Sequence, residues 1–205
     1  MICLNNKFIF IHAPKVGGTS IESCLVSFNK SNNISSIQLN QNMKQLRQDV
    51  IFKNGDLDIQ KHTKLKKIYK TWNNIYGNLN DFVKFGNIRN PWDRAVSYYF
   101  WQYKNETKLC KAKFLKILSR TALDPYYEYF TDSNSLYSLD YYIRFENLQN
   151  DFNLVCEKIG VPYIKIPHIN QSKHLHYSEY YDDELREVIA KKYEKDIEYF
   201  GYLFN

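Results

Sequence analysis

Residues 8–20, Phe-Ile-Phe-Ile-His-Ala-Pro-Lys-Val-Gly-Gly-Thr-Ser, decide the fold that we expect for this chain. The first four residues are an apolar run of strand length, and the next nine contain two glycines, a lysine and two hydroxyl side chains. A helix is predicted after them, because Ile21, Cys24, Leu25 and Phe28 are spaced along one helical face. A buried strand, a glycine-containing loop and an amphipathic helix form the start of a βα unit.

The same order of strand and helix recurs twice. Residues 82–88 read as a strand that leads through Arg89 and Asn90 into a helix begun by Pro91, and residues 141–145 read as a strand before another helix. Three such junctions predict an α/β fold, a P-loop-like three-layer sandwich in which a central parallel sheet is flanked by helices. Helical spacing predicts further helices over residues 41–51, after Thr63, after Glu106, and from Asp182 to Gly201, the last packed on the sheet, whereas residues 52–62 and 163–181 read as loops.

The composition fits a single domain over residues 1–205. A chain of 205 residues with 44% hydrophobic content can bury a core, which excludes disorder as an overall description. The net charge of +6 favours an anionic partner, either nucleic acid or a phosphorylated small molecule. The four cysteines form no CxxC pair, so no zinc site or disulfide framework is indicated. With no signal peptide or transmembrane segment expected, we predict a cytoplasmic protein and leave its oligomeric state open.

The loop after the first strand has the groups that bind a terminal phosphate. It consists of Pro14, Lys15, Val16, Gly17, Gly18, Thr19 and Ser20. The glycines let backbone N–H groups approach the oxygens, the helix N-terminus favours an anion, and the lysine and hydroxyls supply further donors. It is not a Walker A motif, because the lysine precedes both glycines. No strand ends in an aspartate suited to Mg²⁺, so nucleotide triphosphate hydrolysis is disfavoured and no metal is expected.

A second candidate anion site lies between residues 89 and 97. Arg89 precedes a helix and Ser97 lies about two turns along it, so a guanidinium and a hydroxyl can reach one anion together. For Asp93 and Arg94, a local ion pair or a bond to neighbouring loops is as good an interpretation as a functional role.

With both loops in place, the chain resembles the PAPS-dependent sulfotransferases, and most of all their carbohydrate branch, which includes chondroitin and dermatan sulfotransferases and bacterial relatives. Residues 10–20 are similar to the family's 5′-phosphosulfate loop, and residues 89–97 are similar to its 3′-phosphate loop. Weaker similarities at residues 61–63, 144–148 and 180–202 extend the resemblance over nearly the whole chain. Val16 departs from the family, which more often has Thr there.

The resemblance implies transfer of a sulfonyl group from 3′-phosphoadenosine 5′-phosphosulfate (PAPS) to a hydroxyl of a carbohydrate or glycan, with adenosine 3′,5′-bisphosphate released and no metal required. By that likeness Lys15 contacts the bridging oxygen of the leaving 5′-phosphate, the rest of the loop surrounds it, and Arg89 and Ser97 hold the 3′-phosphate. The chemistry agrees, because charge accumulates on the leaving oxygen and a fixed ammonium there stabilises the transition state more than the ground state.

A general base is needed to take the proton of the acceptor hydroxyl. His62 matches a family position where a histidine lies near the acceptor, although a histidine at a helix entrance can also be a cap or a surface group. His12 competes, but a packing role beside the phosphate loop suits it better. His168, His174 and His176 lie in a loop that can face the acceptor, where they read as solvated residues.

Two other classes of function stay open. One is a nucleotide-dependent kinase of P-loop type, which the position of Lys15 counts against. The other is a non-catalytic basic module that binds RNA or an acidic glycan through its basic surface and 18 tyrosines. Salt-sensitive association without a cofactor would support the module, whereas the sulfotransferase interpretation expects no nucleic-acid partner.

Overall fold

The computed structural model describes residues 1–3, 6–29, 62–73, 79–132, 137–167 and 174–205. Its centre is a four-stranded sheet in the order β1 (Ile2–Cys3), β2 (Phe8–Ile11), β3 (Val83–Ile88) and β4 (Tyr141–Arg144). The three longer strands run parallel, whereas β1 pairs antiparallel with β2. The predicted parallel sheet is therefore confirmed for three strands. The edge strand β1 was not predicted, because a two-residue strand is too short to show a periodic pattern.

Strands β2 and β3 approach closely because of their sequences. All four residues of β2 are buried, as expected for a parallel strand that is covered on both faces. In β3, a Cβ atom on Gly86 would lie 2.9 Å from the backbone oxygen of Ile11, so only glycine fits there without a shift. The parallel register, with Ile11 opposite Gly86, brings the carboxyl ends of the two strands to the same edge of the sheet, where both candidate anion loops begin.

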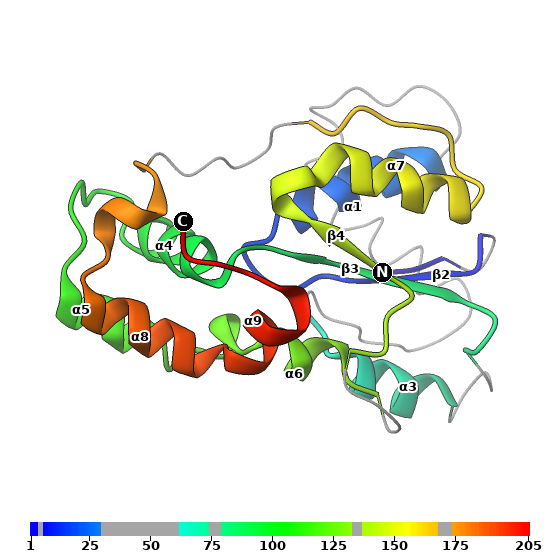
Figure 1. Ribbon diagram of the computed structural model, residues 1–205. Helices are drawn as coiled ribbons and strands as arrows, with labels where there is room; N and C mark the ends of the chain where they lie inside the picture. Colours follow the sequence, from blue (N-terminus) through cyan, green and yellow to red (C-terminus); the bar gives the residue numbers. More distant parts are fainter. Residues whose placement is uncertain (4–5, 30–61, 74–78, 133–136, 168–173) are drawn as a thin grey trace.

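Helices cover both faces of the sheet (Figure 1). Helices α1 (Gly18–Asn29) and α7 (Leu148–Lys158) lie on one face, where they enclose a cluster that includes Phe10 and Phe85. Helices α3 (Leu65–Asn73) and α6 (Tyr126–Phe130) lie on the opposite face with a second cluster that includes Ile9 and Ile11. The predicted arrangement of a sheet between two layers of helices is thus confirmed. Each fully buried apolar side chain contributes about 1.5–3 kcal/mol.

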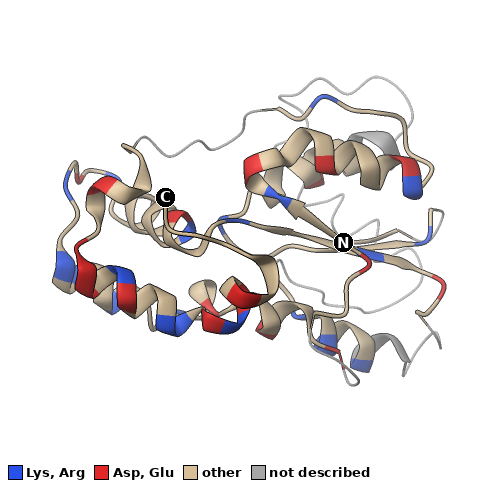
Figure 2. Ribbon diagram, viewed as in Figure 1, with Lys and Arg blue, Asp and Glu red and all other residues tan. Residues whose placement is uncertain are grey.

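The remaining helices lie beyond the carboxyl ends of the strands (Figure 1). They are α4 (Pro91–Gln102), α5 (Lys111–Ile117), α8 (Asp183–Lys192) and α9 (Glu194–Phe200), with short 3₁₀ helices at Thr121–Leu123, Phe145–Asn147 and Tyr177–Tyr180. Charged residues of both signs alternate along α8, whereas the strands are mostly uncharged (Figure 2). None of the helices in the described ranges is both long and apolar enough to cross a membrane.

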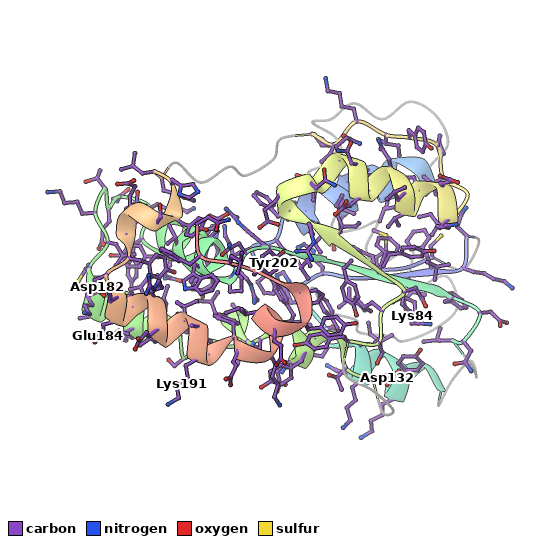
Figure 3. All side chains as sticks on the ribbon, viewed as in Figure 1. Lys84, Asp132, Asp182, Glu184, Lys191 and Tyr202 are labelled. Atoms are coloured by element: carbon purple, nitrogen blue, oxygen red, sulfur yellow. The ribbon has the colours of Figure 1, made fainter. Side chains whose placement is uncertain are left out.

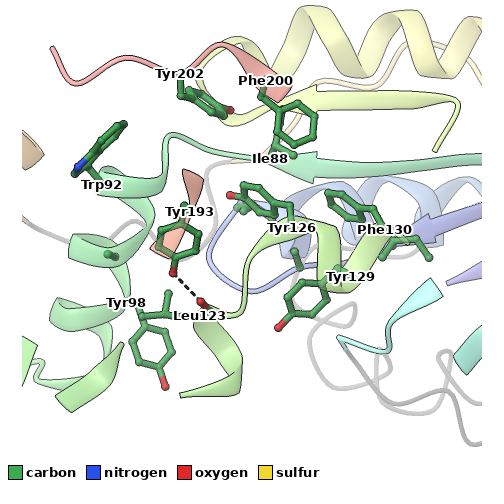
Figure 4. Close-up of a cluster of buried hydrophobic side chains, with 14 of the residues drawn as sticks. Ile88, Trp92, Tyr98, Leu123, Tyr126, Tyr129, Phe130, Tyr193, Phe200 and Tyr202 are labelled. Atoms are coloured by element: carbon green, nitrogen blue, oxygen red, sulfur yellow. Dashed lines mark hydrogen bonds between the residues drawn. The ribbon is translucent and has the colours of Figure 1, made fainter. Parts of the chain in front are cut away.

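The C-terminal segment corrects the sequence prediction in two ways. It forms two helices, because Tyr193 leaves the helical conformation (φ −110°, ψ 22°) while its hydroxyl donates to the Leu123 carbonyl at 2.7 Å (Figure 4). Helix α8 packs on α4 and helix α9 packs on α6, so the predicted packing on the sheet is confirmed only for the end of the segment, which contacts β4 through the rings of Phe200 and Tyr142. The predicted helix over residues 41–51 and most of the loop over residues 52–62 lie outside the described residues.

Helix α6 begins at a carboxylate supplied by α9. Asp196 accepts hydrogen bonds from the backbone N–H groups of Tyr126 (2.6 Å) and Tyr127 (3.1 Å) and from the hydroxyl of Tyr137 (2.8 Å). Burial raises the pKa of this carboxyl, and the three donors oppose the increase. Asp196 therefore satisfies an otherwise exposed helix end and ties the C-terminal segment to the layer that carries α6.

Candidate active site

The loop between β2 and α1 turns through two residues in the left-handed region. Lys15 has φ +65° and Gly17 has φ +78°, with Val16 between them. A left-handed conformation costs a non-glycine residue about 1–2 kcal/mol, so the backbone of Lys15 is strained. Alternation of this kind makes successive backbone N–H groups converge into a concave anion site, and the N-terminus of α1 at Gly18 adds a favourable potential.

The two glycines of the loop also have close neighbours. A Cβ atom on Gly18 would lie 2.2 Å from the His12 ring, and one on Gly17 would lie 3.1 Å from the Phe145 ring. Val16 is fully buried in the core, so its side chain does not line the loop. Packing therefore requires glycine at both positions, and a residue without a side chain also leaves the backbone accessible to an anion. At Val16, only backbone groups are available to a bound ligand.

The remaining members of the loop lie at the start of α1 or before it. Thr19 is partly exposed, whereas Ser20 is buried and its backbone N–H donates to the Gly17 carbonyl at 3.0 Å. Pro14 is buried ahead of Lys15. The seven predicted residues thus form one continuous turn into the helix, and their roles toward a ligand stay predictions.

Lys15 and Arg89 are brought together from two strand-to-helix junctions. The Arg89 Nη1 donates to the Lys15 carbonyl at 3.3 Å, its Nε pairs with Asp93 at 2.7 Å, and its guanidinium stacks 4.0 Å from the Phe145 ring centroid. Burial, followed by the charge of Arg89, lowers the pKa of Lys15 to about 8. A bound anion would favour the charged form of Lys15 and so offset this effect.

The ammonium of Lys15 reaches toward helix α4. It lies 5.7 Å from the ring centroid of Trp101, a half-exposed residue near the end of that helix. Ser97 is four residues before Trp101 and shares its helix face, but it is only 1% exposed. The structure therefore places Ser97 beneath the surface of this region, and its contact with a 3′-phosphate stays a prediction.

His62 lies against the phosphate loop although 50 residues separate it from His12. Its Nδ1 is 2.7 Å from the His12 carbonyl oxygen, and the two rings meet edge to face with centroids 4.7 Å apart. Because a carbonyl can only accept, Nδ1 carries a proton, and in the neutral ring the lone pair then resides on Nε2. His62 also has φ +69°, a second strained backbone beside Lys15. The fold thus gives this histidine the tautomer that a general base requires.

The other histidines are placed differently. His12 is buried and its Nδ1 lies 3.1 Å from a Glu22 carboxylate oxygen, which agrees with the packing role expected for it. His176 is exposed beside Ser178, and His174 stacks on the Phe100 ring at a centroid distance of 5.7 Å. His168 lies outside the described residues.

The segment after β4 holds the second anion loop, a role that we did not predict. The Glu146 carboxylate accepts from the backbone N–H of Asn90 at 2.6 Å and from the Tyr202 hydroxyl at 3.3 Å. Asn90 caps α4 and also donates to the Leu203 carbonyl at 2.9 Å. Tyr202 accordingly lies in the interior of the molecule, whereas Glu184 and Lys191 of α8 point outward (Figure 3). In the sequence, only the resemblance of residues 144–148 and 180–202 to the family pointed to these segments, and it gave no physical reason for their role.

Asp93 and Arg94 follow the two local interpretations offered by the sequence. Asp93 forms the ion pair with Arg89, and Arg94 donates to carbonyls of neighbouring loops, among them that of Pro14 at 3.0 Å. Within the described ranges, no group of three or more His, Cys, Asp or Glu side chains is placed to hold a metal ion.

The comparison with known families agrees with this arrangement. A model of the sulfotransferase family matches residues 1–203, which include both anion loops and His62. No curated protein and no solved structure matches the chain. Since the match extends over almost all of the 205 residues, the chain belongs to the sulfotransferase family.

Proposed function

We propose that this protein is a PAPS-dependent O-sulfotransferase that modifies a hydroxyl of a carbohydrate or glycan. Its family supports sulfonyl transfer as the reaction. The observation that carries the choice of donor is the meeting of Lys15 and Arg89 from two separate junctions, which suits a ligand with two phosphate groups. In this proposal β2, its loop and α1 serve as a P-loop-like unit whose lysine precedes both glycines.

The residues present fit such a donor. The backbone N–H groups between Lys15 and Gly18 would hold the 5′-phosphate, and Arg89, with Ser97 beneath it, would hold the 3′-phosphate. PAPS supplies the sulfonyl group when it is bound. The ammonium of Lys15 would neutralise the charge that develops on the leaving phosphate oxygen. Because the ammonium is partly buried, water screens that interaction less than it would at the surface.

His62 would receive the proton of the acceptor hydroxyl on Nε2. Its Nδ1–H remains bonded to the His12 carbonyl, which keeps the ring oriented and stabilises the imidazolium that forms. The acceptor would approach between His62 and Lys15, close to Trp101. An exposed indole beside the reacting groups suits the apolar face of a sugar ring, because ligand sites combine aromatic walls with a few polar groups. A cytoplasmic location remains part of the proposal.

Calorimetry with adenosine 3′,5′-bisphosphate, AMP and ATP tests the donor. We expect the bisphosphate to bind at least about tenfold more tightly than AMP, because a charge-assisted contact to the 3′-phosphate contributes about 1.5–3 kcal/mol. Arg89→Met should remove this preference. Lys111→Met is the matched control, since it removes one charge from an exposed ion pair with Asp182 and Glu184.

An acceptor screen with labelled PAPS then tests the reaction, with glycans and phenols compared side by side. Label transferred to glycans supports the proposal, and label found only on phenols contradicts the acceptor class. Equal affinities for AMP and the bisphosphate, or tight Mg²⁺-dependent binding of ATP, would favour the kinase-type alternative.

A further inference from the structure

Three consecutive carbonyl groups of the phosphate loop are held by side chains of a single segment. These side chains belong to β3, to the turn after it and to the start of α4, and we call them the carbonyl harness. The three bonds join Pro14 to Arg94 Nε (3.0 Å), Lys15 to Arg89 Nη1 (3.3 Å) and Val16 to Asn87 Nδ2 (3.1 Å). Every peptide of the loop from residue 14 to residue 17 is therefore fixed on its carbonyl side.

The harness determines where the N–H groups of the loop point. In a trans peptide the C=O and the following N–H face opposite directions, and no peptide bond in the described ranges is cis. Holding the three carbonyls toward α4 and β3 turns the N–H groups of Lys15, Val16 and Gly17 the other way. These are the donors of the concave anion site formed by the left-handed turns at Lys15 and Gly17.

Arg94 is the costliest member of the harness. It is 0% exposed, and it also donates hydrogen bonds to the carbonyls of Asp124 (2.9 Å) and Ala122 (3.0 Å). Its guanidinium lies 4.6 Å from the Tyr126 ring centroid. A buried guanidinium bonded to carbonyls in place of a carboxylate is expensive, and an apolar side chain of the same length would fill the space without that cost.

We propose that Arg94 positions the phosphate loop, holding the Pro14 carbonyl so that Lys15 keeps its left-handed conformation and its N–H faces the bound 5′-phosphate. This inference rests on the proposed function. Arg94 is 0% exposed, so a ligand bound at the surface of the loop would not touch it and Arg94 would act through the loop. A variant of Arg89 cannot distinguish positioning of the loop from direct binding of the ligand, because Arg89 is also the candidate that binds the 3′-phosphate. A variant of Arg94 can distinguish them.

The experiment compares two ligands on one variant by calorimetry. Adenosine 3′,5′-bisphosphate uses both anion loops, and adenosine 3′-monophosphate lacks the 5′-phosphate that the harnessed loop would bind. We expect Arg94→Met to weaken the bisphosphate by about tenfold or more, the loss expected for a misplaced charge-assisted site, while the monophosphate changes by less than about twofold. Asn87→Ala, which releases the Val16 carbonyl, should act in the same direction.

Tyr193→Phe is the matched control. It deletes the buried hydrogen bond to Leu123 (Figure 4). The Tyr193 ring, whose centroid lies 6.0 Å from the Arg94 guanidinium, is kept, and no side chain that holds the loop is changed. This variant should lower Tm and leave both affinities unchanged. Arg94→Lys replaces Arg94→Met in this experiment if the methionine variant does not fold. Its single ammonium can hold fewer carbonyls, so we expect a smaller loss of affinity that is again confined to the bisphosphate.

Two failures can be told apart. In the first, the wild-type protein binds the bisphosphate, but the variants lose affinity for both ligands equally and in proportion to the decrease in Tm, or they lose affinity for neither. Arg94 is then merely structural and the inference is overturned. If the wild-type protein shows no preference for the bisphosphate over the monophosphate, the proposed function itself is wrong.

Discussion

The lowered pKa of Lys15 makes the affinity for a phosphate ligand depend on pH. Its pKa is about 8 in the ligand-free protein, lowered first by burial and then by Arg89. A bound anion favours the charged form and raises this pKa, so the complex holds more protons than the free protein above pH 8. Affinity must therefore fall as pH rises through this value.

The size of the effect follows from the fraction of Lys15 that is charged. With a pKa of about 8, about nine-tenths of the side chain is protonated at pH 7 and about one-tenth at pH 9. If the complex requires the charged form, affinity for adenosine 3′,5′-bisphosphate should fall about tenfold between pH 7 and pH 9. The ligand adds little, because the second ionisation of its phosphates lies near pH 6.

Calorimetry at pH 7, 8 and 9 measures this loss, and Lys15→Arg is the control. A guanidinium stays charged over the whole range, so the affinity of this variant should be nearly independent of pH. Parallel pH profiles for the two proteins, or an affinity that rises with pH, would refute the reasoning. Without ligand, the unfolded chain binds more protons than the folded one between pH 8 and 10.5, so the free energy of unfolding should rise across that interval.

Four further outcomes are expected. His62→Asn, which tolerates the positive φ, should keep bisphosphate affinity but lose about 10²–10⁴-fold in turnover, and more than about a tenth of wild-type kcat would return the search to His12 or a carboxylate. Lys15→Ala should lower kcat by about 10²-fold, whereas Arg89→Ala should mainly weaken donor binding; identical kinetic profiles would contradict this division. EDTA should leave turnover intact, and restoration by Mg²⁺ after a loss would count against the proposal. Asp196→Ala should lower the free energy of unfolding in urea by about 1–3 kcal/mol, and a change below about 0.5 kcal/mol would contradict its capping role.

The local pattern of the sequence was enough to locate the two candidate anion loops. A buried apolar run before a glycine-rich turn and an amphipathic helix is determined by short-range forces, which explains why β2, α1, β3 and α4 lie where they were expected. The same applies to the start of α3 after Thr63 and to the Asn90 cap of α4. The strand β1 escaped prediction because its two residues gain their order from pairing with β2.

Only the tertiary structure decided how these pieces act together. The sequence contains Lys15, His62 and Arg89, but their proximity depends on the parallel pairing of β2 with β3 and on a hydrogen bond from His62 to a residue 50 positions away. Arg94 read as an ordinary charged residue, since burial and three carbonyl partners from distant loops leave no trace in its local pattern. Contacts of this kind are determined by how the whole chain closes around the sheet, and no window of neighbouring residues contains them.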